Sequence, residues 1–304
     1  MKVSEAKEQI KNYLIHHLDM NEEDEFILDE LCHFVYEQTG DISYLLEGFD
    51  FNGDPKYLEK IYLYAIECGD EHTAYLLGKL YESGRLGKPD YAKAYEYYLR
   101  ASKTKPIGDG TFENSYRQVH NDAKIKLADM YRRGIYVDKD MGKYKELINE
   151  AYEDVKDKDW TYIRYEALFA KAKLELEEEK IEEGLEILYL AREEYWHLLE
   201  YMQLRSDYEL LDEMNSCLYK YQEIDYTETG PEDLTELLKH PITIRFQYDD
   251  IFYKIRSYQD GESVVIEFED NLYRDPIDFI VRARVGDTWF REMLFNSDMW
   301  EVKR

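Results

Sequence analysis

The chain of 304 residues contains no long uninterrupted apolar run. A membrane-spanning helix needs about 20 such residues, so no span is predicted. Residues 1–7 lack the apolar centre of a secretory signal. With 44% hydrophobic residues, the chain can still bury sizeable cores, and its length fits one repeat array or two domains. We therefore expect a folded, soluble, cytoplasmic protein.

Cysteine is scarce. Cys32, Cys68 and Cys217 are far apart in the chain, and no two of them form a Cys-x-x-Cys pair. This spacing argues against a disulfide framework and against a zinc site of the usual kind. We expect three reduced thiols.

Basic residues are few relative to acidic ones. The chain has 39 lysines and arginines against 67 aspartates and glutamates, which gives a formal net charge of -28. A surface this negative repels nucleic-acid phosphates and anionic lipids, so neither nucleic acid nor membrane is expected as a direct partner. The acidity can keep a helical surface soluble, or it can steer a basic partner toward the protein.

Motifs of known catalytic chemistry are also missing. There is no Gly-x-Ser-x-Gly motif, and Gly108-Asp109-Gly110 lacks the Lys-Ser/Thr that completes a phosphate-binding loop. His16-His17 and Cys32-His33 can share a metal only if their helices meet. Residues 48–59 imitate part of a calcium loop, but Gly48 occupies the first ligand position and Pro55 interrupts the loop. We predict a non-enzymatic protein without metal or cofactor.

What the chain does have is an internal repeat. Over residues 73–102 and 123–152, similar residues recur at the same offsets. In the first copy they are Leu77, Gly78, Tyr81, Gly84, Asp90, Lys93, Ala94, Tyr97, Tyr98, Ala101 and Ser102. In the second copy they are Ala123, Leu127, Ala128, Tyr131, Gly134, Val137, Asp140, Lys143 and Ala151. A recurrence of this length is typical of stacked helical repeats.

A weaker copy covers residues 42–70. Its matching residues are Gly48, Asp54, Tyr62, Ala65, Gly69 and Asp70. Asp54 precedes Asp90 by 36 residues, whereas Asp90 precedes Asp140 by 50. The 14 additional residues fall between the second and third copies, so the register is kept on both sides of an insertion.

Each repeated residue type has a physical role in a helical hairpin. Gly78 and Ala128 are small, as expected where two helices cross closely. Gly84 and Gly134 follow the first helix, where a left-handed cap residue is needed. Asp54-Pro55 is typical of a helix start, because an N-cap side chain precedes a first-turn proline.

The two strong copies resemble the Sel1-like repeat, a helical hairpin related to the tetratricopeptide repeat. The second departs from the family pattern at Tyr144 and Leu147, where the family prefers Ala and an aromatic residue. The resemblance covers residues 42–152. It implies an α-solenoid, and it implies an adaptor that assembles other proteins.

Helical patterns continue on both sides of the repeats. Residues 6–18 and 26–36 look helical and would cap one end of the array. Residues 161–221 have a looser tetratricopeptide-like pattern. There, one face of a long helix carries Leu185, Leu188, Ala191, Tyr195, Leu198 and Met202. Ser206 and Glu209 form a capping-box pattern that opens another helix.

The residue pattern changes near position 240. Apolar and polar residues alternate over 242–248, and two further strands are predicted at 251–258 and 263–268. Asp275-Pro276 starts a helix, and a short strand is predicted at 300–302. We therefore expect a mainly α protein. An α-solenoid would occupy residues 1–225, a linker with a short helix 226–240, and a small α+β module 241–304.

Two regions are predicted to bind protein. If Leu77, Gly78 and Tyr81 face inward, the opposite side of the first helices in the two strong copies presents an outward row. That row contains Tyr75, Lys79, Glu82, Ile125, Asp129 and Arg132. The second region is the insertion at 103–119, which contains Phe112 and is predicted to be a long irregular loop, either a binding loop or a spacer specific to the family.

The favoured function is a non-enzymatic scaffold or adaptor that binds a protein partner. The alternative is an acidic inhibitor or immunity-type protein that binds a basic partner, such as a toxin or a nucleic-acid-binding protein. The two differ in their response to salt, because attraction by an acidic face weakens at high ionic strength whereas packing into a repeat groove does not.

Overall fold

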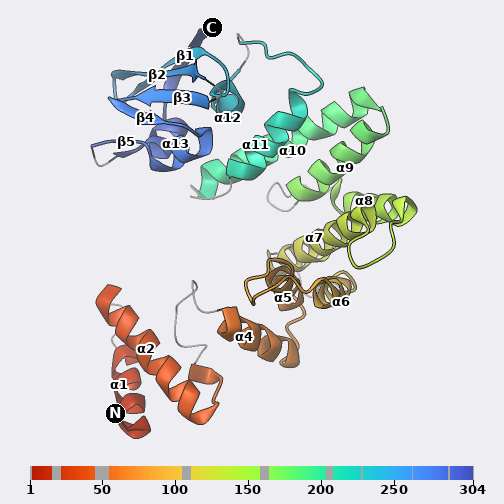
Figure 1. The fold of residues 1–304 in the computed structure, drawn as a ribbon, viewed down its shortest axis with the longest axis vertical. Coiled ribbons are helices and arrows are strands. Elements are labelled where there is room, and N and C mark those ends of the chain that lie inside the picture. Colours follow the sequence, from red (N-terminus) through yellow and green to blue (C-terminus); the bar gives the residue numbers. More distant parts are fainter. Residues whose placement is uncertain are drawn as a thin grey trace. The chain divides into compact units, whose positions relative to one another are not determined.

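The computed structural model describes residues 2–15, 22–44, 55–104, 111–157, 164–202, 208–226, 229–261, 263–286 and 288–303. The chain divides into two units, Met1–Leu147 and Ile148–Arg304. It is mainly helical and ends in an antiparallel sheet (Figure 1).

The first unit begins with a pair of helices, α1 (Val3–Ile15) and α2 (Glu22–Thr39). The predicted helices at 6–18 and 26–36 are thus confirmed for the described residues. The pair has a small core of its own, made of Ala6, Ile10, Leu28, Leu31, Cys32 and Val35. Tyr57 of the next helix stacks on the His33 ring at 4.6 Å and donates a hydrogen bond to Glu37.

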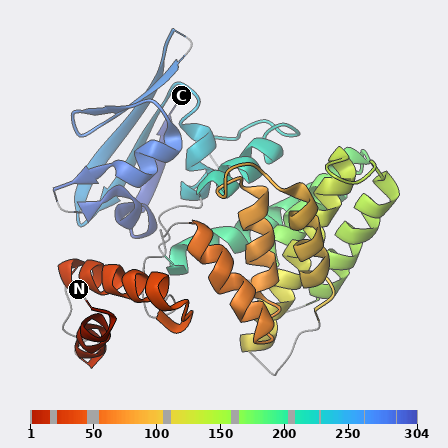
Figure 2. The ribbon, with the colours of Figure 1, turned by 60° about the horizontal axis from the view of Figure 1, so that its bottom comes forward.

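Four helices follow in the first unit, and a fifth begins in the first unit and ends in the second. They are α4 (Pro55–Glu67), α5 (Thr73–Glu82), α6 (Tyr91–Ala101), α7 (Thr111–Arg133) and α8 (Met141–Val155). Helix α4 packs on α5, α5 on α6, and α6 on α7, as Figure 2 shows for the orange to yellow helices. The predicted start at Pro55 is confirmed, whereas Asp54 lies outside the described residues.

The helices of the first strong copy approach each other closely at Gly78. A Cβ atom at this position would lie 2.6 Å from Cε1 of Tyr98 on the facing helix. Tyr98 is fully buried, and its hydroxyl donates a hydrogen bond of 2.6 Å to Glu82. Glycine is therefore required here by the Tyr98 ring, in agreement with the sequence-based interpretation.

The turn after the first helix is the same in both strong copies. Gly84 and Gly134 have φ values of 71° and 69°, in the left-handed region that favours glycine. The N–H groups of Asp90 and Asp140 donate to the carbonyl oxygens of Tyr81 and Tyr131, at 3.0 Å in each copy. The backbone between the two helices of the hairpin therefore follows the same path in both copies.

Side-chain contacts also repeat with the 50-residue offset. Oδ1 of Asp90 accepts from the N–H of Lys93 at 3.0 Å, and Asp140 accepts from Lys143 at the same distance. The Lys93 ammonium lies 4.5 Å from the centre of the Tyr81 ring, and that of Lys143 lies 4.8 Å from the centre of the Tyr131 ring. The sequence repeat is therefore a repeat of three-dimensional contacts.

The predicted loop at 103–119 differs from the structure. Helix α7 begins at Thr111, so residues 111–119 lengthen the first helix of the next hairpin instead of forming an irregular loop. Residues 105–110 lie outside the described residues. Because the helical pattern of α7 continues directly into its repeat, the insertion is accommodated partly by a longer helix.

The second unit starts with the end of α8 and three further helices. They are α9 (Tyr165–Glu177), α10 (Ile181–Met202) and α11 (Tyr208–Leu218). The predicted inner face of α10 is confirmed for Leu188, Ala191 and Tyr195, which are buried, while Met202 lacks a described side chain. Ser206 of the predicted capping box lies outside the described residues.

The sheet contains five antiparallel strands in the order β4-β3-β2-β1-β7. The strands are β1 (Ile242–Tyr248), β2 (Ile251–Asp260), β3 (Ser263–Phe268), β4 (Asn271–Tyr273) and β7 (Asp298–Lys303). Two-residue turns join β1 to β2 and β3 to β4. Asp249 and Asp250 have φ values of 48° and 61°, and Glu269 and Asp270 have values of 47° and 60°. Positive φ at both central residues is the geometry that matches the twist of a hairpin.

The predicted strands at 242–248, 251–258, 263–268 and 300–302 and the helix after Asp275-Pro276 are confirmed. That helix is α13 (Pro276–Arg282). Four short elements were not predicted, because each is too short to show a period. They are β4, β5 (Arg284–Val285), β6 (Thr288–Trp289) and α14 (Phe290–Phe295).

Residues 226–240, predicted as a linker with a short helix, lie inside the second unit. They hold the short helices η2 (Pro231–Asp233) and α12 (Leu234–Leu237). Leu234 and Leu237 join one hydrophobic core with Tyr208 of α11, Phe246 of β1 and Phe290 of α14. The boundary between the two units falls in the sequence between residues 147 and 148, and the sheet shares its core with α9–α11.

We predict that Gly78→Ala lowers the free energy of unfolding by about 1–3 kcal/mol, because the new methyl group overlaps the Tyr98 ring. Urea denaturation followed by circular dichroism measures the change. In a Tyr98→Leu background the same substitution should cost clearly less, since the ring that meets the methyl group is gone. An equal loss of unfolding free energy in both backgrounds would show that the Tyr98 ring does not restrict the size of residue 78.

Candidate binding sites

The predicted outward row on α5 is only partly exposed. Tyr75 is 7% exposed and its ring lies 5.8 Å from that of Tyr98, so the prediction that it points outward is wrong. Helix α5 contacts α4 on one side and α6 on another. Two neighbours bury more of its surface than one neighbour would, and Tyr75 lies in the buried part. Glu82 is half-buried, where it accepts hydrogen bonds from Tyr98 and from Lys126 of α7.

Lys79, Asp129 and Arg132 remain accessible. Lys79 is exposed and lies over the Tyr75 ring at 5.6 Å. Asp129 pairs with Arg132 and Arg133 at 3.0 Å each. Arg132 also lies 5.9 Å from the centre of the Tyr144 ring on α8. Ile125 is half-buried, and Phe112 lies in α7 with its side chain outside the described residues.

A groove of about 240 Å³ lies beside Lys79, between α4 and α5. Its lining consists of Leu58, Tyr62, Leu76, Lys79, Leu80, Ser83 and Arg85. Apolar side chains thus share this small hollow with two cations. Such a lining suits an apolar side chain whose neighbours in the partner are carboxylates.

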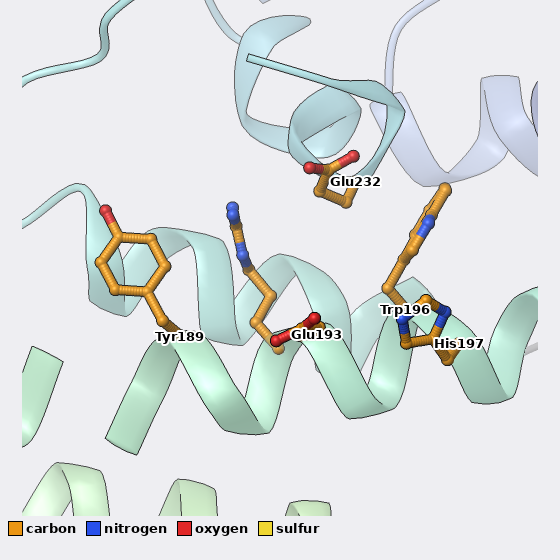
Figure 3. A pocket seen from close by; sticks show the side chains of 6 residues that line it. Tyr189, Glu193, Trp196, His197 and Glu232 are labelled. Atoms are coloured by element: carbon orange, nitrogen blue, oxygen red, sulfur yellow. The ribbon is translucent and has the colours of Figure 1, made fainter. Parts of the chain in front are cut away.

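A larger pocket, of about 360 Å³, lies on the polar side of α10 in the second unit. Figure 3 shows Tyr189, Glu193, Trp196 and His197 projecting from this helix, while Glu232 lies across the pocket from them on η2. Residues 189, 193 and 196 lie on one face because they are separated by four and three positions. Two aromatic rings and two carboxylates therefore line the same hollow.

Arg192 also lines this pocket, but its charge is already paired. Its guanidinium forms an ion pair with Asp233, which is 3% exposed, and donates a hydrogen bond of 3.2 Å to Asn215. Burial alone would lower the pKa of Arg192, but the Asp233 carboxylate outweighs burial and the pKa is raised. One cation thus stands among three carboxylates, those of Glu193, Glu232 and Asp233.

Asp233 also fixes the η2 segment on α11. It accepts a hydrogen bond of 2.6 Å from the Tyr219 hydroxyl and one of 3.0 Å from the N–H of Gly230. Burial, together with the nearby Asp233 carboxylate, raises the pKa of Tyr219. The side of the pocket formed by Glu232 is consequently held in place by its neighbour.

The α10 pocket suits the cationic end of a lysine or arginine side chain. Aromatic faces attract cations through their quadrupole, and Trp and Tyr do so most strongly. Glu193 and Glu232 supply acceptors for the cation, and a guanidinium can also stack on the Trp196 ring. Trp196 packs on Phe295 with ring centres 5.0 Å apart, so a second aromatic ring supports this wall of the pocket.

This pocket was not predicted from the sequence. The helical period predicts only the buried face of α10, although Tyr189 and Trp196 are two turns apart on its polar face. Two aromatic residues at this spacing among glutamates are a usable signal. Glu232 could not have been added to them, since it lies in a segment that the sequence predicted to be a linker.

Other classes of site find little support in the described residues. Among them, no group of three His, Cys, Asp or Glu side chains has an arrangement that could hold a metal ion. His16-His17 and most of the calcium-like segment lie outside the described residues. The apolar stretches of the described helices fall short of what a membrane span requires. No family model, curated protein or solved structure matches the chain.

We predict that Asp233→Asn lowers the free energy of unfolding by about 3–5 kcal/mol, because it leaves the Arg192 guanidinium without its buried counter-ion. The neighbouring substitution Glu232→Gln removes the same charge from a half-buried position and should cost less than about 1 kcal/mol. Thermal and urea denaturation of both variants provide the measurement. Similar losses in the two variants would argue against the ion pair as the support of η2.

Proposed function

We propose that this chain is a cytoplasmic, non-enzymatic scaffold that binds protein partners through an α-solenoid of Sel1-like hairpins. The observation that supports it best is the three-dimensional repeat at Tyr81, Asp90 and Lys93 and again 50 residues later. Stacked hairpins of this kind create extended surfaces that suit recognition of other proteins. The role of adaptor comes from the resemblance to the Sel1-like repeat.

The α4–α5 groove is the proposed contact point on this array. It places Lys79, the most accessible member of the predicted row on α5, beside Leu76 and Leu80. A partner segment with one large apolar side chain and an adjacent carboxylate would bury the first in the groove and pair the second with Lys79 or Arg85. Burial of the apolar side chain makes this contact resistant to salt.

We predict that Lys79→Glu removes partner proteins that the unmodified chain captures from a native lysate at high salt. The matched control is Lys88→Glu, which makes the same charge change at an exposed lysine in the α5–α6 loop. Quantitative mass spectrometry of the captured proteins measures the loss. The groove is not the contact point if both variants keep the same partners or if both lose them equally.

Deletion of the sheet is not a usable alternative to these point variants. The strands share one hydrophobic core with α9–α12, so a chain ending before β1 would lose part of that core and would leave Leu234 and Leu237 of α12 without α13. Any loss of binding by such a fragment would report unfolding of the second unit rather than the position of a site.

A second candidate function is favoured by the α10 pocket. In this case the chain is an acidic protein that binds and blocks a basic partner, and the pocket receives one lysine or arginine side chain of that partner. The net charge of -28 would accelerate the encounter, while Glu193, Trp196 and Glu232 would hold the cation, since Arg192 already lies over the Tyr189 ring.

We predict that an arginine- and lysine-containing peptide binds the full chain and that Glu193→Gln and Glu232→Gln each weaken it about threefold, as expected for part-exposed ion pairs. Glu223→Gln, at an exposed carboxylate beyond α11, is the control and should leave affinity unchanged. Isothermal titration calorimetry gives the dissociation constants at about 0.1 M and about 1 M salt. Equal weakening by all three substitutions would indicate general attraction rather than a pocket.

A further inference from the structure

The outer face of the sheet concentrates positive charge on a strongly acidic protein. Side chains alternate between the two faces of each strand, and those of Ile244 and Phe246 enter the core. The opposite face carries four exposed cations from three strands, and we call it the cationic sheet face. They are Arg245 of β1, Lys254 and Arg256 of β2, and Lys303 of β7.

The strand register brings these cations together. Arg245 lies directly opposite Lys254 across the β1–β2 pair, and Thr243 lies between Arg256 on one neighbouring strand and Lys303 on the other. Directly opposed like charges destabilise an antiparallel pair. The Arg245–Lys254 pair is therefore unfavourable by itself, whereas Arg245 also lies opposite Glu301 of β7 and Arg256 lies opposite Glu267 of β3.

Three carboxylates also lie on this face, namely Glu267, Glu301 and Asp260, of which Asp260 pairs with Arg274 at 3.5 Å. Glu301 lies 3.9 Å from Arg245 and 2.7 Å from Lys303, while Glu267 lies 3.9 Å from Arg256. These are exposed pairs, which contribute little energy in water. Among the described interactions no ion pair involves Lys254.

Large apolar side chains accompany the cations. Phe252 of β2 is 66% exposed and Leu272 of β4 is 65% exposed, and Tyr258 is exposed near the other end of β2. The register places Phe252, Lys254, Arg256 and Tyr258 on alternate positions of one strand and therefore on one face. A surface of this kind offers both charge and apolar area to a binding partner.

We propose that the cationic sheet face binds a short acidic segment of a partner protein. Carboxylates of the segment pair with Arg245, Lys254, Arg256 and Lys303, and its apolar side chains lie against Phe252 and Leu272. Five strands spaced about 4.8 Å apart span roughly 20 Å, which a segment of six or seven extended residues covers. This face is distinct from the α4–α5 groove, and its ligand carries the opposite charge to that of the α10 pocket.

Charge complementarity favours a short segment over nucleic acid. A nucleic-acid strand carries a phosphate at every nucleotide, so a strand longer than the face would meet the acidic remainder of the molecule. A protein segment can confine its carboxylates to the part that touches the cations. The aromatic residues alone do not decide between the two, since bases and apolar side chains both contact aromatic rings.

Fluorescence anisotropy with the full chain tests the proposal. The probe is a labelled peptide with glutamate and phenylalanine or leucine mixed among every second position, so that both kinds of side chain can face the sheet, and a peptide with glutamine in place of glutamate is its control. We expect the acidic peptide to bind and Lys254→Glu to weaken it about tenfold, because an attractive contact becomes repulsive. Lys88→Glu makes the same charge change in the first unit and should alter affinity less than twofold.

The Lys254→Glu variant separates loss of binding from loss of folding. It replaces the repulsive pair of Arg245 and Lys254 with an attractive one, so its melting temperature should equal or exceed that of the parent chain. Reduced binding by a variant of unreduced stability supports the proposal. Equal weakening by Lys88→Glu, or equal affinity for the glutamine peptide, would overturn it.

Two other occupants are outcomes of the same experiment. A labelled single-stranded oligothymidylate tests nucleic acid as the ligand. Nucleic acid is the ligand if this probe binds the parent chain more tightly than the acidic peptide does and if Lys254→Glu abolishes that binding. Analytical ultracentrifugation tests whether the ligand is a second copy of the chain. Dimerisation of the parent chain, together with a monomeric Lys254→Glu variant, would show that it is. Either result overturns the assignment to an acidic segment.

Discussion

Packing of each helix from α4 to α6 against the next one along the chain is the interaction on which the first unit depends. The close approach at Gly78 lets α5 and α6 pack together, and the glycine turn that follows the first helix recurs at Gly84 and Gly134. The second unit is held together differently. There, α9–α11 complete their core with α12, α13, α14 and one face of the sheet.

Electrostatics gives the surfaces different chemical characters despite the acidic composition. Carboxylates surround the paired Arg192 in the α10 pocket, cations share the α4–α5 groove with apolar residues, and cations gather on the outer face of the sheet. Since the Debye length is about 8 Å at physiological salt, surfaces farther apart than this act almost independently. The net charge of the protein therefore affects the rate at which a charged partner approaches it. The local charges of each surface determine which partner binds there.

The repeat was predictable because its signals are local. Gly84, Gly134, Asp90 and Asp140 each specify a turn or a cap through their own backbone, and the structure shows each in that role. Exposure was less predictable. Tyr75 was assigned outward from helical periodicity, which identifies one buried face but does not reveal that a middle helix contacts neighbours on two sides. Pockets are harder still, since Glu232 and Trp196 meet only after the fold brings distant segments together.

The edges of the sheet limit how this protein can associate. Strand β4 has only three residues, and β7 carries the exposed charges of Glu301 and Lys303. Short and charged edge strands are poor templates for pairing with another chain. The sheet can therefore present a broad face with exposed aromatic residues while its borders resist the edge-to-edge growth that leads to fibrils.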